Sequence, residues 1–468
     1  MVTYNDLLTA INENRLKDFV RDTINKHKTS EEYQMALCAD EYNRRLNRTI
    51  IMYQKLLYKV TGEAVPDNFS ANYKLRSNFF NRFVTQLNQY LLGNGVTWTN
   101  EKTGEMLGND FDNQLEDAGE KALVHSVSFG FWNLNKLQIF SLLEFVPLYD
   151  EEDGSLKAGI RFWQIADNKP LRATLYELDG YTDYKWDKDN PEGIELNPKR
   201  AYIVKLKGTD ADGMEIYDYQ NYPTFPIVPF WGNKYKQSEF VGMRENIDCY
   251  DLIKSGFANT VDEASMVYWT INNANGMDDI DLAKFVEHMK TVKASIIDDN
   301  GATAESHTLD VPYASREALL DRLRADMYED FMALDTKNIA NGAVTATQID
   351  ASYEPLNSKA DKYEYCVINF INGILALAGI DDKPTFTRSK IVNRTEEVQT
   401  VLQAGEYLGE DYTTKKILTI FGDADMVEDV LKEKDLADMQ RMGNIADGNE
   451  DTGDDMDGQG TESTGETN

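Results

Sequence analysis

The chain has few bases, cysteines and histidines, and each shortage excludes a class of protein. It contains 48 Lys and Arg but 80 Asp and Glu, which gives a net charge of -32. This charge argues against a protein that binds nucleic acid by neutralising phosphates. Cys38, Cys249 and Cys366 form no CxxC pair, so the sequence predicts no disulfide framework and fits a reducing compartment. The 4 histidines are scattered without the spacing of metal ligands.

Catalytic and membrane signals are also missing. The sequence holds no GxxxxGKS/T phosphate loop, no HExxH metal motif and no GxSxG nucleophile turn. The first residues lack the pattern of a signal peptide, and no apolar run approaches membrane-spanning length. These absences predict a protein that is not an enzyme, needs no cofactor or metal, and stays where it is made or in a particle built there.

Apolar residues are nevertheless sufficient for several folded modules. The 468 residues exceed one ordinary core, and 41% of them are hydrophobic. Helical periodicity dominates the part before Lys136, with Ser30 as an N-cap and with Thr61-Gly62 and either Gly93 or Gly95 as stop signals. The predicted helices cover Leu7–Ile24, Ser30–Leu57, Leu75–Leu92 and Phe111–Phe129.

The next region, from Lys136 to Val228, has the pattern of short antiparallel strands. Alternating runs are separated by Asp-Gly and Asn-Pro turns. Aromatic side chains crowd this region, and because acids intervene and bases are scarce, we expect them to form sheet core rather than to stack on nucleic acid. The predicted strands include Ala158–Ile165, Ala173–Leu178, Ala201–Lys207 and Glu215–Tyr219, and the aromatic residues are Tyr176, Tyr181, Tyr184, Trp186 and Tyr202.

A long helix follows the prolines of the segment Pro226–Asn233, and we expect it to run from about Phe240 to Ile271. Apolar residues from Met243 to Tyr268 recur at steps of three and four and form one stripe. A second stripe carries acidic and small polar groups. It consists of Glu245, Asp248, Ser255, Asn259 and Asp262. The period defines these stripes but not the direction in which either one points.

Beyond Ile271 the pattern predicts a small insertion between two helices. Two candidate strands, Val292–Ile297 and His307–Val311, flank the turn-rich stretch DDNGATAES. Ser315 is positioned as the N-cap of a second amphipathic helix. Its apolar stripe is Leu320, Leu323, Met327, Phe331 and Leu334.

The remaining third alternates between connections and helices. The stretch from Asp335 to Ala346 is a long connection that contains glycine and few residues to bury. A helix begins near Thr345 to Gln348, bends at Pro355 and ends at Gly379. A strand (Pro384–Val392) and three short helices (Glu396–Tyr407, Thr413–Phe421 and Met426–Arg441) follow, and the tail from Gly443 has eight acids without Lys or Arg, which predicts mobility.

Several segments, in this order, resemble the portal proteins of tailed bacteriophages. The resemblance lies in the helix SNFFNRFVTQLNQYLLGNGV, the strand and turn VPFWGN before a long helix, the two helices around an α/β insertion, and the helical stretch from YLGEDYTT onward. It implies an α+β, mainly helical, portal-type fold. The implied parts are a wing (1–236), a first stem helix (237–271), a clip (272–313), a second stem helix (314–336), a tunnel loop (337–347), a kinked wing helix and strand (348–392), a helical crown (393–442) and an acidic tail (443–468).

The resemblance also implies a function without catalysis. Portal proteins form a homo-oligomeric ring, most often of twelve subunits, at one vertex of the phage head. Such a ring docks the terminase motor, contacts the major capsid and scaffolding proteins, and later receives the head-tail adaptor. Double-stranded DNA passes through it without sequence-specific binding during packaging and ejection. The implied location is the virion, after assembly in the host cytoplasm.

The same resemblance assigns candidate site residues. Lys337, Asn338, Asn341, Val344 and Thr345 belong to the tunnel loop, and Asp298, Asp299, Asn300 and Glu305 to the clip that contacts the adaptor. The polar stripe from Glu245 to Asp262 is expected to face the channel, because carboxylates near the axis would keep DNA centred and unbound. The alternative is that this stripe is a solvated or intersubunit helix face.

Two other classes of protein are compatible with the residues alone. A non-viral helical scaffold that binds protein partners predicts a monomer or a dimer. An enzyme with an unrecognised site predicts a thermal transition that a ligand shifts upward.

Overall fold

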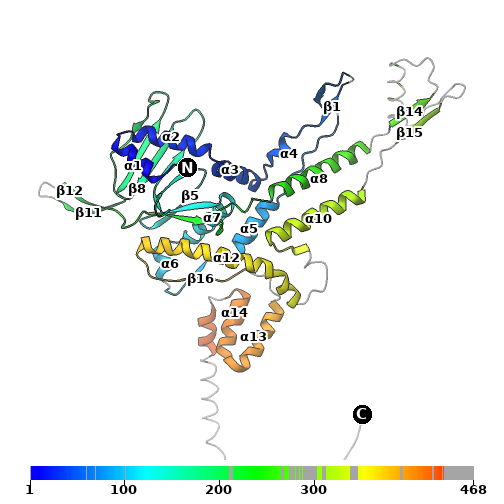
Figure 1. Cartoon of the computed structure of the whole chain (residues 1–468). Coiled ribbons are helices and arrows are strands. Elements are labelled where there is room, and N and C mark those ends of the chain that lie inside the picture. The colour runs from blue at the N-terminus through cyan, green and yellow to red at the C-terminus, as the bar shows by residue number, and fades with distance from the viewer. Residues whose placement is uncertain are drawn as a thin grey trace, which may run out of the picture. The chain divides into compact units, whose positions relative to one another are not determined.

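A computed structural model describes most of the chain in two compact units, Met1–Ser389 and Lys390–Asn468. The described residues are 2–264 except 60, 69, 101 and 210–213, then 268–272, 280, 284, 287, 303–307, 313–337, 346–389, 394–423, 426–434 and 436. Figure 1 shows the order of the helices and strands. Across these ranges, no helix has both the length and the apolar character needed to cross a membrane.

The N-terminal helices are shorter than predicted. The helix expected over Leu7–Ile24 is two helices, α1 (Tyr4–Asn12) and α2 (Leu16–Lys28), because Asn14 adopts a left-handed turn with φ 54°.

The helix expected over Ser30–Leu57 is also divided. Ser30 caps α3 (Glu31–Asn43) through a hydrogen bond from the Tyr33 N–H, as predicted. Arg45, with φ 62°, then separates α3 from α4 (Arg48–Met52). The hairpin of β1 (Leu56–Tyr58) and β2 (Ala64–Pro66) follows, so Thr61-Gly62 forms its turn rather than a helix end.

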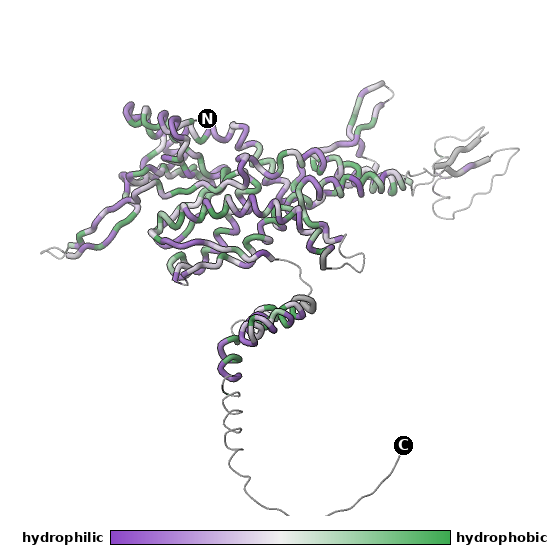
Figure 2. Tube along the Cα trace, turned by 60° about the horizontal axis from the view of Figure 1, so that its bottom comes forward, coloured by the Kyte–Doolittle hydropathy of each residue, from purple (hydrophilic) through white to green (hydrophobic). Residues whose placement is uncertain are grey.

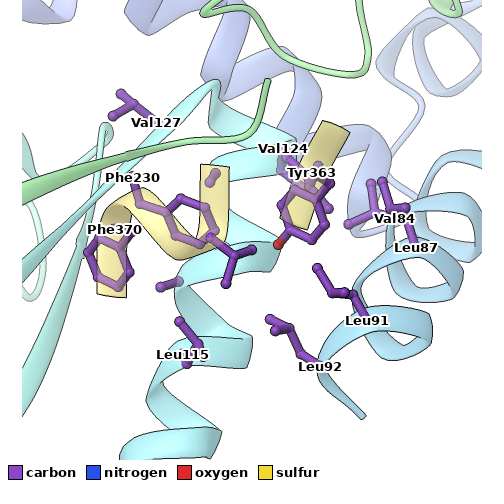
Figure 3. Packing of buried hydrophobic residues seen from close by; sticks show 14 of the residues in the cluster. Val84, Leu87, Leu91, Leu92, Leu115, Val124, Val127, Phe230, Tyr363 and Phe370 are labelled. Carbon is purple, nitrogen blue, oxygen red and sulfur yellow. The ribbon is translucent and has the colours of Figure 1, made fainter. Parts of the chain in front are cut away.

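Three helices and a three-stranded sheet build the main core. The helices are α5 (Phe79–Leu92), α7 (Phe111–His125) and α12 (Ala346–Ala378), and the sheet has the order β13 (Ile227–Trp231), β4 (Val127–Asn133), β5 (Lys136–Ser141). Figure 3 shows where they meet: Phe230 of β13 stacks on Tyr363 and Phe370 of α12, with ring centroids 6.0 and 4.8 Å away. The helix predicted to reach Phe129 ends at His125, because Ser126 has φ 75° and the strand begins at once.

The strand region predicted from Lys136 to Val228 is confirmed as antiparallel strands. One five-stranded sheet has the order β10-β9-β8-β7-β6, and α2 packs against its strands β6 and β7. Of the five aromatic residues predicted to form sheet core, four are less than 10% exposed and Tyr181 is half-buried. The strands are β6 (Phe145–Tyr149), β7 (Leu156–Trp163), β8 (Leu171–Glu177), β9 (Gly180–Trp186) and β10 (Ile194–Glu195), and β11 (Ile203–Thr209) pairs separately with β12 (Glu215–Gln220).

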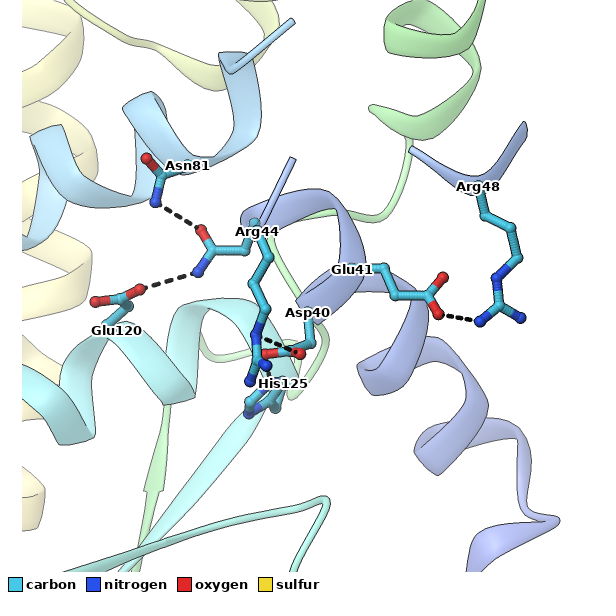
Figure 4. A network of polar contacts seen from close by, with 8 residues as sticks. Asp40, Glu41, Arg44, Arg48, Asn81, Glu120 and His125 are labelled. Carbon is cyan, nitrogen blue, oxygen red and sulfur yellow. Dashed lines mark hydrogen bonds and ion pairs between the residues drawn. The ribbon is translucent and has the colours of Figure 1, made fainter. Parts of the chain in front are cut away.

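A polar network fixes α3 against the core helices (Figure 4). Asn43 of α3 accepts a hydrogen bond from Asn81 of α5 at 3.2 Å and donates one to Glu120 of α7 at 2.9 Å. Asp40 pairs with Arg44 at 2.9 Å and lies 3.4 Å from the buried His125 ring. The His125 ring therefore lies in a buried environment next to an ion pair.

The two long helices on either side of the insertion run side by side in both views (Figures 1 and 2). They are α8 (Arg244–Ala264) and α10 (Tyr313–Phe331). The helix predicted to reach Ile271 is too long, because Tyr268–Asn272 forms strand β14, which pairs antiparallel with β15 (Thr303–His307). Aromatic and β-branched residues favour such a strand, and its partner lies thirty residues away.

The other predictions for the insertion are partly outside the described residues. The strand predicted over His307–Val311 begins at Thr303 instead, and 308–311 are not described. The strand predicted over Val292–Ile297 also lies outside the described residues. The second helix begins at Tyr313, two residues before the predicted cap at Ser315.

The helix predicted to bend at Pro355 is one helix, α12, that contains this proline. Strand β16 (Pro384–Phe386) then pairs with β3 (Val96–Trp98), which follows α5, and α6 (Lys102–Leu107) comes next in the chain. In the second unit α13 (Arg394–Leu408) packs against α14 (Glu410–Phe421), and residues 427–434 are helical, as predicted. The predicted tail, 443–468, is outside the described residues.

Candidate functional site

The candidate site begins with the antiparallel pair of α8 and α10. Near one end of the pair Asn246 donates a hydrogen bond to Asp330 at 3.4 Å. Near the other end Arg316 donates to Thr260 at 2.8 Å and lies over the Phe257 ring. Contacts at both ends mean that the two helices form one structural element rather than two independent arms.

A second side of α8 faces the N-terminal part of the same chain. Asp251 is fully buried and accepts hydrogen bonds from the Asn47 side chain at 2.9 Å and the Ser77 N–H at 2.8 Å. Burial raises the pKa of this carboxyl, and the hydrogen bonds oppose that rise. The second bond satisfies the backbone N–H of Ser77, which lies in a segment without regular structure of its own.

The predicted polar stripe of α8 largely coincides with this side, and three of its five residues bond to the N-terminal part of the same chain. Ser255 is only 5% exposed and accepts a hydrogen bond from the Leu75 N–H at 2.9 Å. Asn259 accepts one from the Tyr73 N–H at 2.7 Å, and Asp248 accepts one from the Tyr42 hydroxyl. The sequence pattern identified the stripe correctly, but an acidic and small polar face serves equally well to bind an extended backbone.

The other two stripe residues differ from these three. Glu245 is exposed, whereas Asp262 is half-buried and has an interaction partner. Glu245 shares an edge of α8 with Cys249, Leu252 and Gly256, since these residues are spaced three or four apart. Of them, Cys249 is exposed and Leu252 is 43% exposed.

The chain that leaves α10 is clamped before the predicted tunnel loop. Met332 has φ 61°, which ends the helix and redirects the backbone. The Gln86 side chain of α5 then makes two hydrogen bonds to the Leu334 backbone, donating to its carbonyl and accepting from its N–H, both at 3.0 Å. The Arg324 guanidinium donates two hydrogen bonds to the Asp335 carboxylate, at 2.6 and 2.8 Å. The position of the chain is therefore fixed up to residue 335.

A buried lysine joins this clamp to two other segments. Lys359 of α12 donates to the Phe331 carbonyl at 3.0 Å and lies 3.3 Å from the centroid of the same residue's ring. It also forms an ion pair with Glu239 at 2.6 Å, and both side chains are about 15% exposed (15% and 16%). Burial lowers the pKa of the Lys359 ammonium, and the Glu239 carboxylate opposes that shift. Sequence reasoning missed this residue because its partners lie 28 and 120 positions away.

Two of the predicted loop and clip residues, Lys337 and Glu305, are among the described residues. Lys337 is exposed, and its N–H donates to Asp335 at 3.1 Å. Glu305 is exposed on β15, opposite Thr270 of β14. The remaining candidates, Asn338, Asn341, Val344 and Thr345 of the loop and Asp298, Asp299 and Asn300 of the clip, lie outside the described residues.

The described side chains do not offer a metal site. Over the described ranges, no group of three or more His, Cys, Asp or Glu side chains is arranged to hold a metal ion. The buried carboxylates and ammonium discussed above bond to other groups of the chain. What the described residues provide is a pair of long helices whose chain is held at Leu334 and Asp335.

Comparison with known proteins identifies the class to which this architecture belongs. The sequence matches the family model described as "Phage portal protein, SPP1 Gp6-like" over residues 22–440. The chain therefore belongs to this family of phage portal proteins, components of the phage head and virion. The family predicted from the sequence is confirmed, and it is a structural family, not one known for catalysis.

Two phage portal proteins agree with this assignment at low identity. The portal protein of Clostridium phage phiCD119 is 24% identical over 363 residues, which cover 70% of this chain and 77% of the relative. The portal protein of Bacillus phage SPP1 is 22% identical over 391 residues, covering 75% and 73%. A chain in the neck of an empty GTA particle aligns with a TM-score of 0.41 and 10% identity over 71% of this chain and 87% of that one.

Proposed function

We propose that copies of this chain close into a ring that forms the DNA channel at one vertex of the phage head, with twelve subunits as the expected number. The observation that carries this proposal is the helix pair α8 and α10 on its clamped base. The two long helices are antiparallel and packed together, and α8 has an exposed edge, so the pair could form one segment of a channel wall. Copies related by rotation would build a continuous wall from such elements through heterologous contacts.

The parts of the ring follow from the order of the elements. We assign residues 1–236 and 348–392 to the wing, α8 and α10 to the stem, residues 272–313 to the clip, 337–347 to the tunnel loop and 393–442 to the crown. The stem helices are shorter than the sequence ranges 237–271 and 314–336, because α8 ends at Ala264 and α10 at Phe331. Of the predicted channel-facing stripe, the proposal keeps Glu245, whose side chain is exposed.

The proposed partners follow from these parts. The clip, including Asp298, Asp299, Asn300 and Glu305, is the proposed contact for the terminase motor and later for the head-tail adaptor. The wing is the proposed contact for the major capsid and scaffolding proteins during assembly in the host cytoplasm. Double-stranded DNA is expected to slide past Lys337, Asn338, Asn341, Val344 and Thr345 without sequence-specific binding, since a net charge of -32 disfavours phosphate neutralisation.

The mass of the purified full-length protein in solution tests the ring directly. Light scattering on a size-exclusion column should give a multiple of the 53.3 kDa chain mass near twelve, and negative-stain images of that peak should show rings with a central hole. A stable dimer at high concentration would contradict the proposed ring.

The loop assignment needs a separate test. Deleting Ile339 to Val344 should leave the ring intact, because the clamp at Leu334 and Asp335 lies outside the deletion. Packaging or retention of DNA in an infection-complementation assay should fall. Normal packaging by the deletion variant would contradict the assignment of these residues to the channel.

A further inference from the structure

A groove runs along α8 on the side where the N-terminal segment and α10 approach it. Its volume is about 490 Å³, and it lies between α8, α10, residues 50–55 and residues 73–74. Gly256 lies in the groove, and a Cβ added there would meet no atom within 4 Å. The absence of a side chain at this position leaves room for an incoming group to approach the α8 backbone closely.

Large apolar side chains border the groove but remain open to solvent. Tyr53 and Tyr73 come from the N-terminal segment, Leu252 from α8 and Leu319 from α10. Their exposed fractions are 46%, 51%, 43% and 46%. Four such residues around one groove form an apolar surface that a partner would cover with a gain of free energy.

The charges around the groove are unusual for this chain. Lys55, Lys74 and Arg316 line it, and no Asp or Glu is among the described residues that do so. Acids outnumber bases 80 to 48 in the whole sequence. Because the described charged residues of this lining are all cations, the groove favours an occupant that presents acidic side chains together with apolar or small side chains.

The opposite flank of the same helix pair has these properties. Arg316 and Asp330 of α10 contact α8, so the helical period places Ala314, Ala318 and Ala325 on the side that points away, with Asp321 beside them. These four residues are all exposed, as is the neighbouring Glu317. Alanines at this spacing allow a helix to approach a partner closely.

We propose that the α8 groove receives the outer face of α10 from the next copy of this chain. The inference rests on the ring proposed above and specifies its stem contact. Asp321 and Glu317 would then oppose the groove cations, and the alanines would lie over Gly256 and the exposed leucines. The groove and the outer face of α10 lie on different sides of one helix pair. The contact is therefore heterologous and repeats from copy to copy.

Charge reversal in the full-length protein tests the contact. Asp321→Lys should abolish the ring peak in size-exclusion light scattering at concentrations where the wild type is fully assembled. Lys74→Glu should do the same, and the double variant should restore the ring. Asp167→Lys, the same change at an exposed loop position of the five-stranded sheet region, should leave the ring unchanged. An unchanged monomer melting temperature for Asp321→Lys excludes loss of folding as the cause.

Disulfide trapping provides a second readout that does not depend on charge. In a Cys249→Ser background, Gly256→Cys combined with Ala318→Cys should give a ladder of covalent multimers after oxidation, whereas either cysteine alone should not. Mixing the two single-cysteine chains before assembly should give covalent dimers only.

The outcomes separate this inference from the ring itself. The groove contact would be wrong, but the ring would stand, if three results came together. The wild type would form rings, Asp321→Lys would form them equally well, and cysteines at positions 256 and 318 would give no covalent multimers. Trapping of Gly256→Cys by Tyr58→Cys instead of Ala318→Cys would also overturn it, in favour of the β1–β2 hairpin of the neighbour as occupant. A wild type that never assembles would refute the proposed function.

Discussion

Replacing Glu239 with glutamine should lower the stability of the folded protein, although the change is chemically small. Glu239 is the ion-pair partner of Lys359, which also bonds to the end of α10 at Phe331. The carboxylate lies 2.6 Å from Lys359 and accepts a second hydrogen bond from Asn233 at 2.8 Å. Glutamine keeps the shape but removes the charge, so Lys359 remains a cation at a site where its side chain is only 15% exposed. Hydrogen bonds to charged groups are worth about 1 to 2 kcal/mol more than neutral ones. We expect Glu239→Gln to lower the free energy of unfolding by about this amount, below the 3 to 5 kcal/mol of a fully buried broken pair.

Chemical denaturation of the monomeric protein measures this loss. Glu63→Gln is a matched control, because Glu63 pairs with Lys59 on the surface, where the two side chains are 64% and 53% exposed. Exposed pairs contribute about 0 to 1 kcal/mol, so the control should change little. If Glu239→Gln cost no more than Glu63→Gln, the argument that the buried pair joins three segments would be wrong.

The pH dependence gives an independent check of the same pair. Burial lowers the pKa of Lys359 below its ordinary value of 10.5. The unfolded chain therefore binds more protons than the folded one between the lowered pKa and 10.5, and in that window this group makes stability rise with pH. Without Glu239 the pKa of Lys359 falls further, so the loss of stability caused by Glu239→Gln should become smaller as the pH is raised toward 10.5. A deficit that stayed constant over this range would indicate that Lys359 is not the group left without its counter-charge.

Two further predictions use other contacts of the same region. Gln86→Ala removes both hydrogen bonds to the Leu334 backbone, so it should cost about 1 to 2 kcal/mol and speed amide hydrogen exchange at Leu334, and unchanged exchange there would argue against the clamp. Gly119→Ala would place a Cβ 2.2 Å from the Tyr363 hydroxyl and should cost about 1 to 3 kcal/mol in thermal or denaturant unfolding. The matched change Gly256→Ala meets open space and should stabilise the monomer by about 0.5 to 1 kcal/mol, so an equal effect of the two changes would contradict the packing at Gly119.

Local patterns predicted the type of most elements but not where the long helices end. Alternation found the strands of the five-stranded sheet, because each strand has one face in a core and the next residue out of it. The same reasoning extended α8 through Tyr268–Asn272, whose strand pairing depends on residues 303–307. Pairing over that separation leaves no local signal. The breaks at Asn14 and Arg45 are likewise left-handed turns at non-glycine residues, which sequence alone rarely reveals.

The candidate site was less predictable than the fold. The polar stripe on α8 was visible, yet its partner was not, since Ser255 and Asn259 bond to backbone N–H groups about 180 residues earlier in the chain. Asp251, the most buried acid of this helix, was not singled out, because a carboxylate that accepts backbone hydrogen bonds looks like any surface acid in the sequence. Lys359 likewise depends on partners from two distant segments.

The two ends of the proposed tunnel loop are anchored to one helix. Before the loop, Leu334 is held by Gln86 of α5, and after it, Tyr353 stacks on Tyr90 of α5 with ring centroids 5.7 Å apart. Gln86 and Tyr90 are four residues apart, so both anchors lie on the same face of α5. Whatever conformation the loop adopts, its ends therefore keep a fixed separation. A force applied to this loop would therefore act on α5 and on the helices α7 and α12 that pack against it.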